Sequence, residues 1–351
     1  MAVTTPTTRV AAPAADEAAD DAPEPRRAVR ARAVGGDRVF LGALTGSGLS
    51  VLVVIAVIGT FLTVRAWQAL HVAGWGFVTT AQWQPGVGTG GQSRFGVAGI
   101  LTGTVLIGVC AIVIAVPLAF CVALYISEYA PARFKSLCTS LIDLMAAVPS
   151  VVYGLWGFLF LEHRAVGTAR WMAEYLGWIP LFKVDGARPD DPLAPMTVYT
   201  ASTFIAGMVV ALMITPIVCS MMRESFSQAP LGEREGAYAL GATRWGMIRM
   251  VVLPFGRGGM IGGTMLGLGR ALGETIAVYM IVSLVFQIQP HILQAGGSSV
   301  AALIAAHYGT ATSFELSALM AAGLSLFLLT LVINLAASAV IARSRSGQES
   351  G

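Results

Sequence analysis

The sequence predicts an all-α, polytopic membrane protein with six transmembrane helices. Of its 351 residues, 56% are hydrophobic and only 12% are charged, about half the charged fraction of an average soluble domain. Roughly 20 apolar residues are enough to cross a bilayer as a helix, and six weakly charged stretches approach or exceed that length. These stretches are residues 39–64, 95–127, 144–161, 192–222 (apolar from about residue 199), 258–286 and 316–342.

The composition argues against several other classes of protein. Too little charge is present to cover the surface of a water-soluble enzyme, and the net charge of +3 gives no basic field suited to nucleic acid. Four cysteines lie in apolar segments without a CxxC pair, so neither a disulfide framework nor a metal site is indicated. We also find no candidate catalytic set, and we expect the chain to carry out no covalent chemistry.

Composition along the chain predicts the domain organisation, and the positions of Lys and Arg predict the orientation in the membrane. Residues 1–38 are rich in Ala, Pro and charge, which predicts a disordered tail. The transmembrane domain then covers 39–342, and 343–351 form a second tail. With both ends in the cytoplasm, 15 of the 22 basic residues lie inside and 6 outside, with one in the membrane, as the positive-inside rule requires.

Proline and glycine positions give expectations about the helices. Pro117, Pro149 and Pro216 fall within the second, third and fourth predicted helices, where each is expected to cause a kink. The kinks suit either packing alone or a path that opens and closes. Glycines at 259, 263 and 267 predict close approach of another helix. Residues 162–198 are expected to form a long external loop, either a partner-binding loop or a solvated loop with aromatic anchors.

Two charges lie within the fifth predicted helix. Arg270 and Glu274 are one turn apart near the middle of 258–286, where each charge costs about 2.5–3.5 kcal/mol. A helical i,i+4 pair returns only about 0.2–0.5 kcal/mol at a surface. Two interpretations remain, a structural salt bridge or a polar pathway in which the arginine meets an anion. The planar fork of arginine suits phosphate oxygens.

The cytoplasmic loop at about 233–254 carries a specific motif. It begins Glu235-Gly236-Ala237, has Gly241 four positions after Ala237, and ends Leu253-Pro254. From residue 233 to 249 the composition is helical and is interrupted by Gly241. Taken alone, this helical spacing also fits an amphipathic helix on the membrane surface. The loop resembles the EAA motif of bacterial ABC importer permeases, E-A-A-x3-G-x9-I-x-L-P, with Gly in the second position and Val251 in the Ile position. The resemblance implies a coupling helix that docks on an ATPase subunit, with the coupling residues Glu235, Gly236, Ala237, Gly241, Leu253 and Pro254.

Two further segments resemble one particular group of ABC importer permeases. Residues 143–157 read DLMAAVPSVVYGLWG and residues 269–275 read GRALGET, which resembles the phosphate-specific importer permease (PstC) family over about 39–342. This likeness implies the type I ABC importer permease fold and places Arg270 and Glu274 on the translocation pathway. Asp143, where the family often has Glu, and Pro149 become candidates for gating.

The same resemblance implies a set of partners in a bacterial cytoplasmic membrane. They are a PstA-like permease, two PstB-like ATPase subunits and an extracellular PstS-like phosphate-binding protein, with inorganic phosphate as substrate. ATP and Mg would bind the partner ATPase, and this chain would hold no cofactor. Two alternatives remain: a permease for another oxyanion such as sulfate or molybdate, or a receptor or scaffold without transport. An EAA-type loop favours a permease over a scaffold.

Overall fold

The computed structural model describes residues 35–85, 94–186 and 195–346. The predicted N-terminal tail therefore lies outside the described residues up to position 34, and its last four residues already belong to helix α1 (Gly35–Ala73). At the other end, α13 (Ser313–Ser346) continues four residues into the predicted C-terminal tail.

The described chain divides into two units at residue 55. The part of the first unit that is described is the first half of α1, where the residues from Gly36 to Ile55 whose burial is described are all exposed. The second unit, from residue 56 onward, contains every other helix and strand.

Four of the six predicted membrane-spanning segments, 39–64, 95–127, 192–222 and 316–342, overlap long apolar helices. Among the described residues, five helical stretches are long and apolar enough to cross a membrane, and one bent pair of helices makes a sixth candidate. The five stretches are Arg38–Ala73, Ala98–Tyr129, Thr203–Ser227, Arg244–Leu272 and Ser313–Ala339, and the bent pair is Ala132–Ala147 with Ser150–Leu176.

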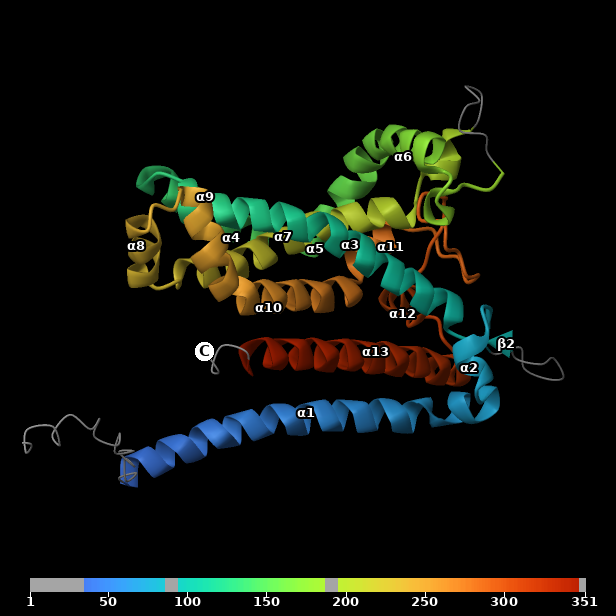
Figure 1. The fold of residues 1–351 in the computed structure, drawn as a ribbon. Helices are drawn as coiled ribbons and strands as arrows, with labels where there is room; N and C mark the ends of the chain where they lie inside the picture. The colour runs from blue at the N-terminus through green and yellow to red at the C-terminus, as the bar shows by residue number, and fades with distance from the viewer. Residues whose placement is uncertain (1–34, 86–93, 187–194, 347–351) are drawn as a thin grey trace, which may run out of the picture. The chain divides into compact units, whose positions relative to one another are not determined.

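The centre of the second unit is made of three helices that pack against one another: α3 (Ala98–Leu124), α7 (Thr203–Ser227) and α10 (Leu253–Leu272). The three helices are labelled in Figure 1. Glycines on α10 face α7, as predicted. A Cβ at Gly259 would lie 2.2 Å from the Cβ of Ser225, so the two backbones approach at a distance that only glycine permits.

The third predicted helix is broken rather than kinked. Residues 144–147 end α4 (Ala132–Ala147), and the rest of the predicted helix begins again as α5 (Ser150–Trp156). The helical stretch Ser150–Leu176 is bent by 89° from α4. The expectation that Pro149 lies within a helix is therefore wrong, because Val148 and Pro149 both have extended backbones. A residue before proline is disfavoured in the helical region, which ends α4 at this point. Pro117 and Pro216 do lie inside helices, in α3 and α7.

The segment predicted as an external loop is largely helical. A π-helical turn at Gly157–Leu161 joins α5 to α6 (Glu162–Leu176), so the loop expectation is wrong for the first fifteen residues of 162–198. Ala165, Ala169 and Ala173 recur every four residues and are buried, which is the spacing of one helix face. Two 3₁₀ turns follow, at Pro180–Phe182 and Met196–Tyr199.

Short elements complete the second unit. Strands β1 (Trp83–Gln84) and β2 (Arg94–Phe95) pair antiparallel, with Trp83 opposite Phe95. The π-helical turns Tyr125–Tyr129 and Ile248–Val252 extend α3 and precede α10. The remaining helices are α2 (Gly76–Thr79), α8 (Leu231–Ala239), α9 (Arg244–Met247), α11 (Ile276–Ile281) and α12 (Val300–His307).

Candidate translocation and coupling sites

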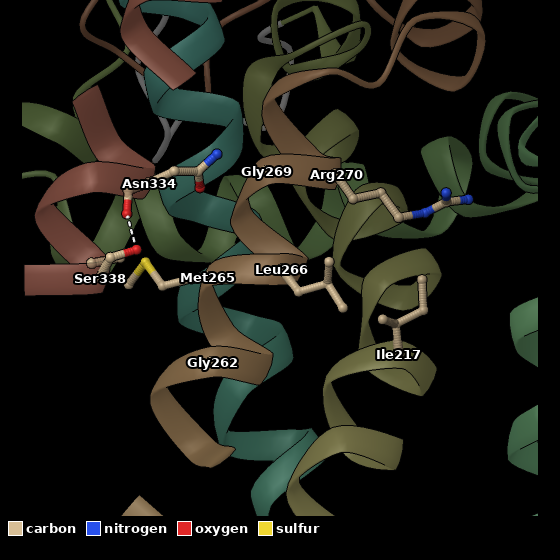
Figure 2. Close-up of a pocket in the computed structure, with 9 residues that line it drawn as sticks. Ile217, Gly262, Met265, Leu266, Gly269, Arg270, Asn334 and Ser338 are labelled. Atoms are coloured by element: carbon tan, nitrogen blue, oxygen red, sulfur yellow. Dashed lines mark hydrogen bonds between the residues drawn. The ribbon is translucent and has the colours of Figure 1, made fainter. Parts of the chain in front are cut away.

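Arg270 lies in the last turn of α10 and is exposed. It lines a cavity of about 650 Å³ that is otherwise formed by side chains of α7, α10 and α13. Within the described chain, no hydrogen bond or ion pair holds its guanidinium group. Figure 2 shows the side chain extending away from Asn334 and Ser338 of α13. The other lining residues are Ile217, Gly262, Met265, Leu266, Gly269 and Ala337.

Glu274 lies on the far side of a helix end from Arg270. The predicted continuous helix over 258–286 is wrong, because α10 ends at Leu272 and α11 begins at Ile276. The two charges therefore do not share a helix face, and no ion pair joins these two described residues. The Glu274 side chain is 8% exposed, and its Oε1 accepts a hydrogen bond at 3.3 Å from the backbone N–H of Ala277.

This hydrogen bond explains the break. Glycine has low helix propensity, so Gly273 ends α10 at little cost, and the freed N–H groups of the next helix need an acceptor. The carboxylate of Glu274 supplies that acceptor at the positive end of α11. The interpretation of Arg270 and Glu274 as a structural salt bridge is therefore wrong, and Glu274 caps a helix instead.

The predicted interruption of the segment 233–254 at Gly241 is confirmed. Helix α8 ends at Ala239, and Gly241 has a φ of +81°. The N–H of Gly241 donates to the carbonyl of Tyr238, and the N–H of Ala242 donates to that of Ala237. These two bonds form the Schellman arrangement, in which a left-handed residue closes a helix. A glycine is needed here for its backbone, since a Cβ at this position would have no atom within 4 Å of it.

The other predicted coupling residues divide into an exposed and a packed group. Glu235 and Gly236 are exposed on α8, whereas Ala237 is buried. Leu253 packs against the same apolar cluster as Ala237. Pro254 lies at the start of α10, directly after the π-helical turn, where its missing N–H is tolerated.

The two predicted gating residues lie near the bend between α4 and α5. Asp143 is exposed on α4, and Pro149 forms the bend itself. The hydroxyl of Tyr153 on α5 donates a hydrogen bond to the carbonyl of Met145 on α4 at 3.0 Å, and this bond stabilises the bend. No hydrogen bond or ion pair between described residues joins Asp143 to Arg270, so the structure does not unite them in one site.

Glu128 and Arg234 are two site residues that were not predicted from the sequence. Their side chains form an ion pair with an N–O distance of 3.0 Å, between the end of the α3 stretch and α8. A charged residue directly after the apolar stretch 95–127 was the available signal, but its partner is 106 residues away in sequence.

Comparison with known proteins identifies the family. Residues 111–346 match the family model described as the binding-protein-dependent transport system inner membrane component. The chain belongs to this family.

Individual members of this transport family show the same likeness over most of their length. The chain is 39% identical to the phosphate transport system permease protein PstC 2 of Mycobacterium tuberculosis, over 87% of this chain and 91% of that protein. It is 40% identical to the phosphate transport system permease protein PstC of Mycobacterium leprae, over 80% of this chain and 85% of that protein. Among solved structures, an ABC transporter involved in the import of the polysaccharide alginate gives a TM-score of 0.48 at 16% identity, over 70% and 78%.

Membership in the binding-protein-dependent transport family agrees with the helices described above. This inner membrane component is a multi-pass, all-α membrane protein of the ABC importer permease type. Its family works in transport as one component of a larger system.

Proposed function

We propose that this chain is the membrane-spanning permease subunit of an ATP-driven phosphate importer. The observation that carries the proposal is its similarity to the mycobacterial PstC permeases, at 39–40% identity over at least 80% of the chain. A likeness of that extent includes both the membrane helices and the cytoplasmic loop.

The surroundings of Arg270 support an anionic substrate. The side chain is exposed, lines a cavity and has no partner within the described residues. An ionisable group in a membrane helix costs about 2.5–3.5 kcal/mol and is a functional candidate for that reason. Arginine can bind two oxygens of one phosphate through its planar fork. In this proposal Arg270 supplies the positive potential on an otherwise apolar path.

The cytoplasmic helix α8 supports coupling to an ATPase. Leu231, the first residue of α8, is 70% exposed, and Leu240, which directly follows α8, is 90% exposed. Exposed apolar groups at a helix end suit burial in a cleft of a partner. We therefore assign α8 to contact with PstB-like ATPase subunits, which bind ATP and Mg. The other partners are a PstA-like permease and an extracellular PstS-like phosphate-binding protein, with both termini of this chain in the cytoplasm.

Reconstitution tests this function directly. The chain would be assembled in liposomes with its candidate partner permease, ATPase subunits and binding protein. Uptake of labelled phosphate is then compared with uptake of labelled sulfate and molybdate, with and without ATP. The proposal predicts ATP-dependent uptake of phosphate that excess sulfate does not reduce. Uptake of sulfate or molybdate in preference to phosphate would support the other oxyanion function instead, and no uptake of any oxyanion would remove the transport assignment.

A further inference from the structure

Helix α8 is attached to the membrane helices through few side chains. Seven of its nine residues are exposed, and the two that are not, Arg234 and Ala237, lie one turn apart. Ala237 packs in an apolar cluster that includes Phe226 and Met247. An alanine buries little area, and Arg234 is the residue of α8 whose side chain forms hydrogen bonds and an ion pair to other described elements.

Arg234 joins α8 to two other helix ends. One of its terminal nitrogens, Nη1, lies 3.0 Å from Oε2 of Glu128. The other, Nη2, donates to the carbonyl of Phe226 on α7 at 2.6 Å, and Nε donates to that of Ala229 at 3.2 Å. The guanidinium group is therefore fixed from three directions, and its side chain is only 18% exposed.

Glu128 is held as firmly at the end of the α3 stretch. Its side chain is 4% exposed, and the Ser127 hydroxyl donates to its second oxygen at 2.9 Å. The Glu128 backbone carbonyl also accepts a hydrogen bond from Arg244, which follows Gly241 in the chain. The Arg244 guanidinium lies 4.8 Å above the ring of Tyr129. One turn of the α3 stretch is thus bound to the segments before and after Gly241.

A buried ion pair of this kind resists separation. Moving one partner away strands the other charge where water does not compensate it, and this is strongly unfavourable. A displacement of α8 is therefore expected to displace the end of the α3 stretch with it. Helix α3 packs along α7 and α10, and α10 carries Arg270. Figure 1 shows α8 and α9 at the same end of the second unit as the start of α10.

We propose that Glu128 and Arg234 form the mechanical link through which a movement of α8 reaches α3. This inference rests on the proposed function, since it presumes that an ATPase moves α8. Glu128 and Arg234 are positioning residues in this account. They contact neither the transported ion nor the nucleotide.

The following variants distinguish a role of the Glu128–Arg234 pair in transmitting movement from a role in stability alone. Glu128→Met and Arg234→Met each strand one charge and should reduce the amount of assembled complex. The double variant with both changes removes both charges and should assemble, because replacing a buried pair by apolar groups is often neutral. In proteoliposomes the double variant should hydrolyse ATP, yet labelled phosphate transported per ATP should fall by at least about fivefold, the lower end of typical coupling effects.

Two variants serve as controls. Arg249→Met makes the same chemical change in the same cytoplasmic segment at an exposed residue, and Arg249 has no ion pair or hydrogen bond within the described residues. It should leave transport per ATP unchanged. Arg234→Lys keeps the charge but loses the fork, so it should assemble better than Arg234→Met and recover part of the coupling. An unchanged ratio of phosphate to ATP in the double variant would overturn the link.

A second measurement does not depend on the substrate. Spin labels at exposed Gly232 on α8 and exposed Val113 on α3 report whether the two helices move as one body. The distance should be the same with and without trapped ATP in the wild-type complex and should change with ATP in the double variant. A distance that changes with ATP already in the wild-type complex contradicts the link. If the wild-type complex takes up no phosphate, the proposed function fails while this distance still tests the link.

Discussion

Arg270 and Glu274 lie on opposite sides of a helix end, Arg270 in the last turn of α10 and Glu274 as the cap of α11. Four positions apart in sequence, they have different surroundings. The arginine is exposed beside a cavity, whereas the carboxylate is buried against the backbone of Ala277. The two residues should therefore respond differently to substitution. Because no ion pair joins them within the described residues, replacing Glu274 should not change the availability of the Arg270 guanidinium group.

Glu274 should tolerate loss of its charge better than loss of its acceptor. Glu274→Gln keeps a side-chain carbonyl for the N–H of Ala277, whereas Glu274→Ala removes it and should cost about 1–2 kcal/mol. Thermal unfolding of the assembled complex should show a lower midpoint for the Ala variant than for the Gln variant. Equal loss of phosphate uptake in both variants, at equal stability, would mean that the charge itself is needed for transport.

Gly241 should be irreplaceable for a backbone reason. Its φ of +81° costs a residue with a side chain about 1–2 kcal/mol, so Gly241→Ala should disturb the end of α8 and lower phosphate uptake per ATP. Gly232→Ala is the matched control, because Gly232 lies on the same helix α8 with open space around it and is not one of the predicted coupling residues. That change should stabilise α8 by roughly 0.5–1 kcal/mol. Similar coupling defects in the two variants would contradict this interpretation.

The bend between α4 and α5 should depend on Pro149 more than on Tyr153. Pro149→Ala removes the restriction on Val148 and allows the helix to straighten, so uptake should fall with little change in assembly. Tyr153→Phe removes one hydrogen bond to Met145, worth about 0.5–1.5 kcal/mol, and should act mainly on stability. The comparison is made by uptake and thermal unfolding of the same preparations. Full uptake by Pro149→Ala would exclude a gating role for the bend.

The orientation of the chain can be tested with two exposed residues. Single cysteines replacing Asp185 and Gln228 in a cysteine-free background should label from opposite sides of the membrane. Asp185 is itself exposed and pairs with the exposed Lys183, so its replacement should be harmless. An impermeant thiol reagent on intact cells should modify the cysteine at 185 and not the one at 228. Modification of both positions would show that the predicted orientation is wrong.

Features that depend on local composition could be predicted from the sequence. The membrane helices follow from long apolar stretches, and the close approach of α10 to α7 follows from glycines at four-residue spacing. The turn at Gly241 was likewise predictable, because one glycine interrupts an otherwise helical segment.

Features that depend on long-range contacts could not be predicted from the sequence. The end of α10 at Leu272 lies within a largely apolar, helix-like pattern and is fixed by the cap from Glu274. The pair of Glu128 and Arg234 joins residues 106 positions apart, and a single sequence does not show such pairs. Helix α6 was missed because its polar exposed face hid the regular spacing of its buried alanines.

Arg270→Gln tests whether the transported phosphate passes the guanidinium group of Arg270. Because Arg270 is exposed and has no partner among the described residues, the variant complex should assemble as well as the wild type. Losing a hydrogen bond to a charged group costs about 1.5–3 kcal/mol, which corresponds to roughly a 10- to 100-fold loss of phosphate uptake. Arg270→Lys should retain part of the activity, since it keeps the charge without the fork. The decisive measurement is ATP-dependent uptake of labelled phosphate by liposomes that contain equal amounts of wild-type and Arg270→Gln complexes. If phosphate passes Arg270, the wild-type complex takes up phosphate and the variant loses at least about tenfold of that uptake. Equal uptake by both complexes would contradict a role of Arg270 on the path.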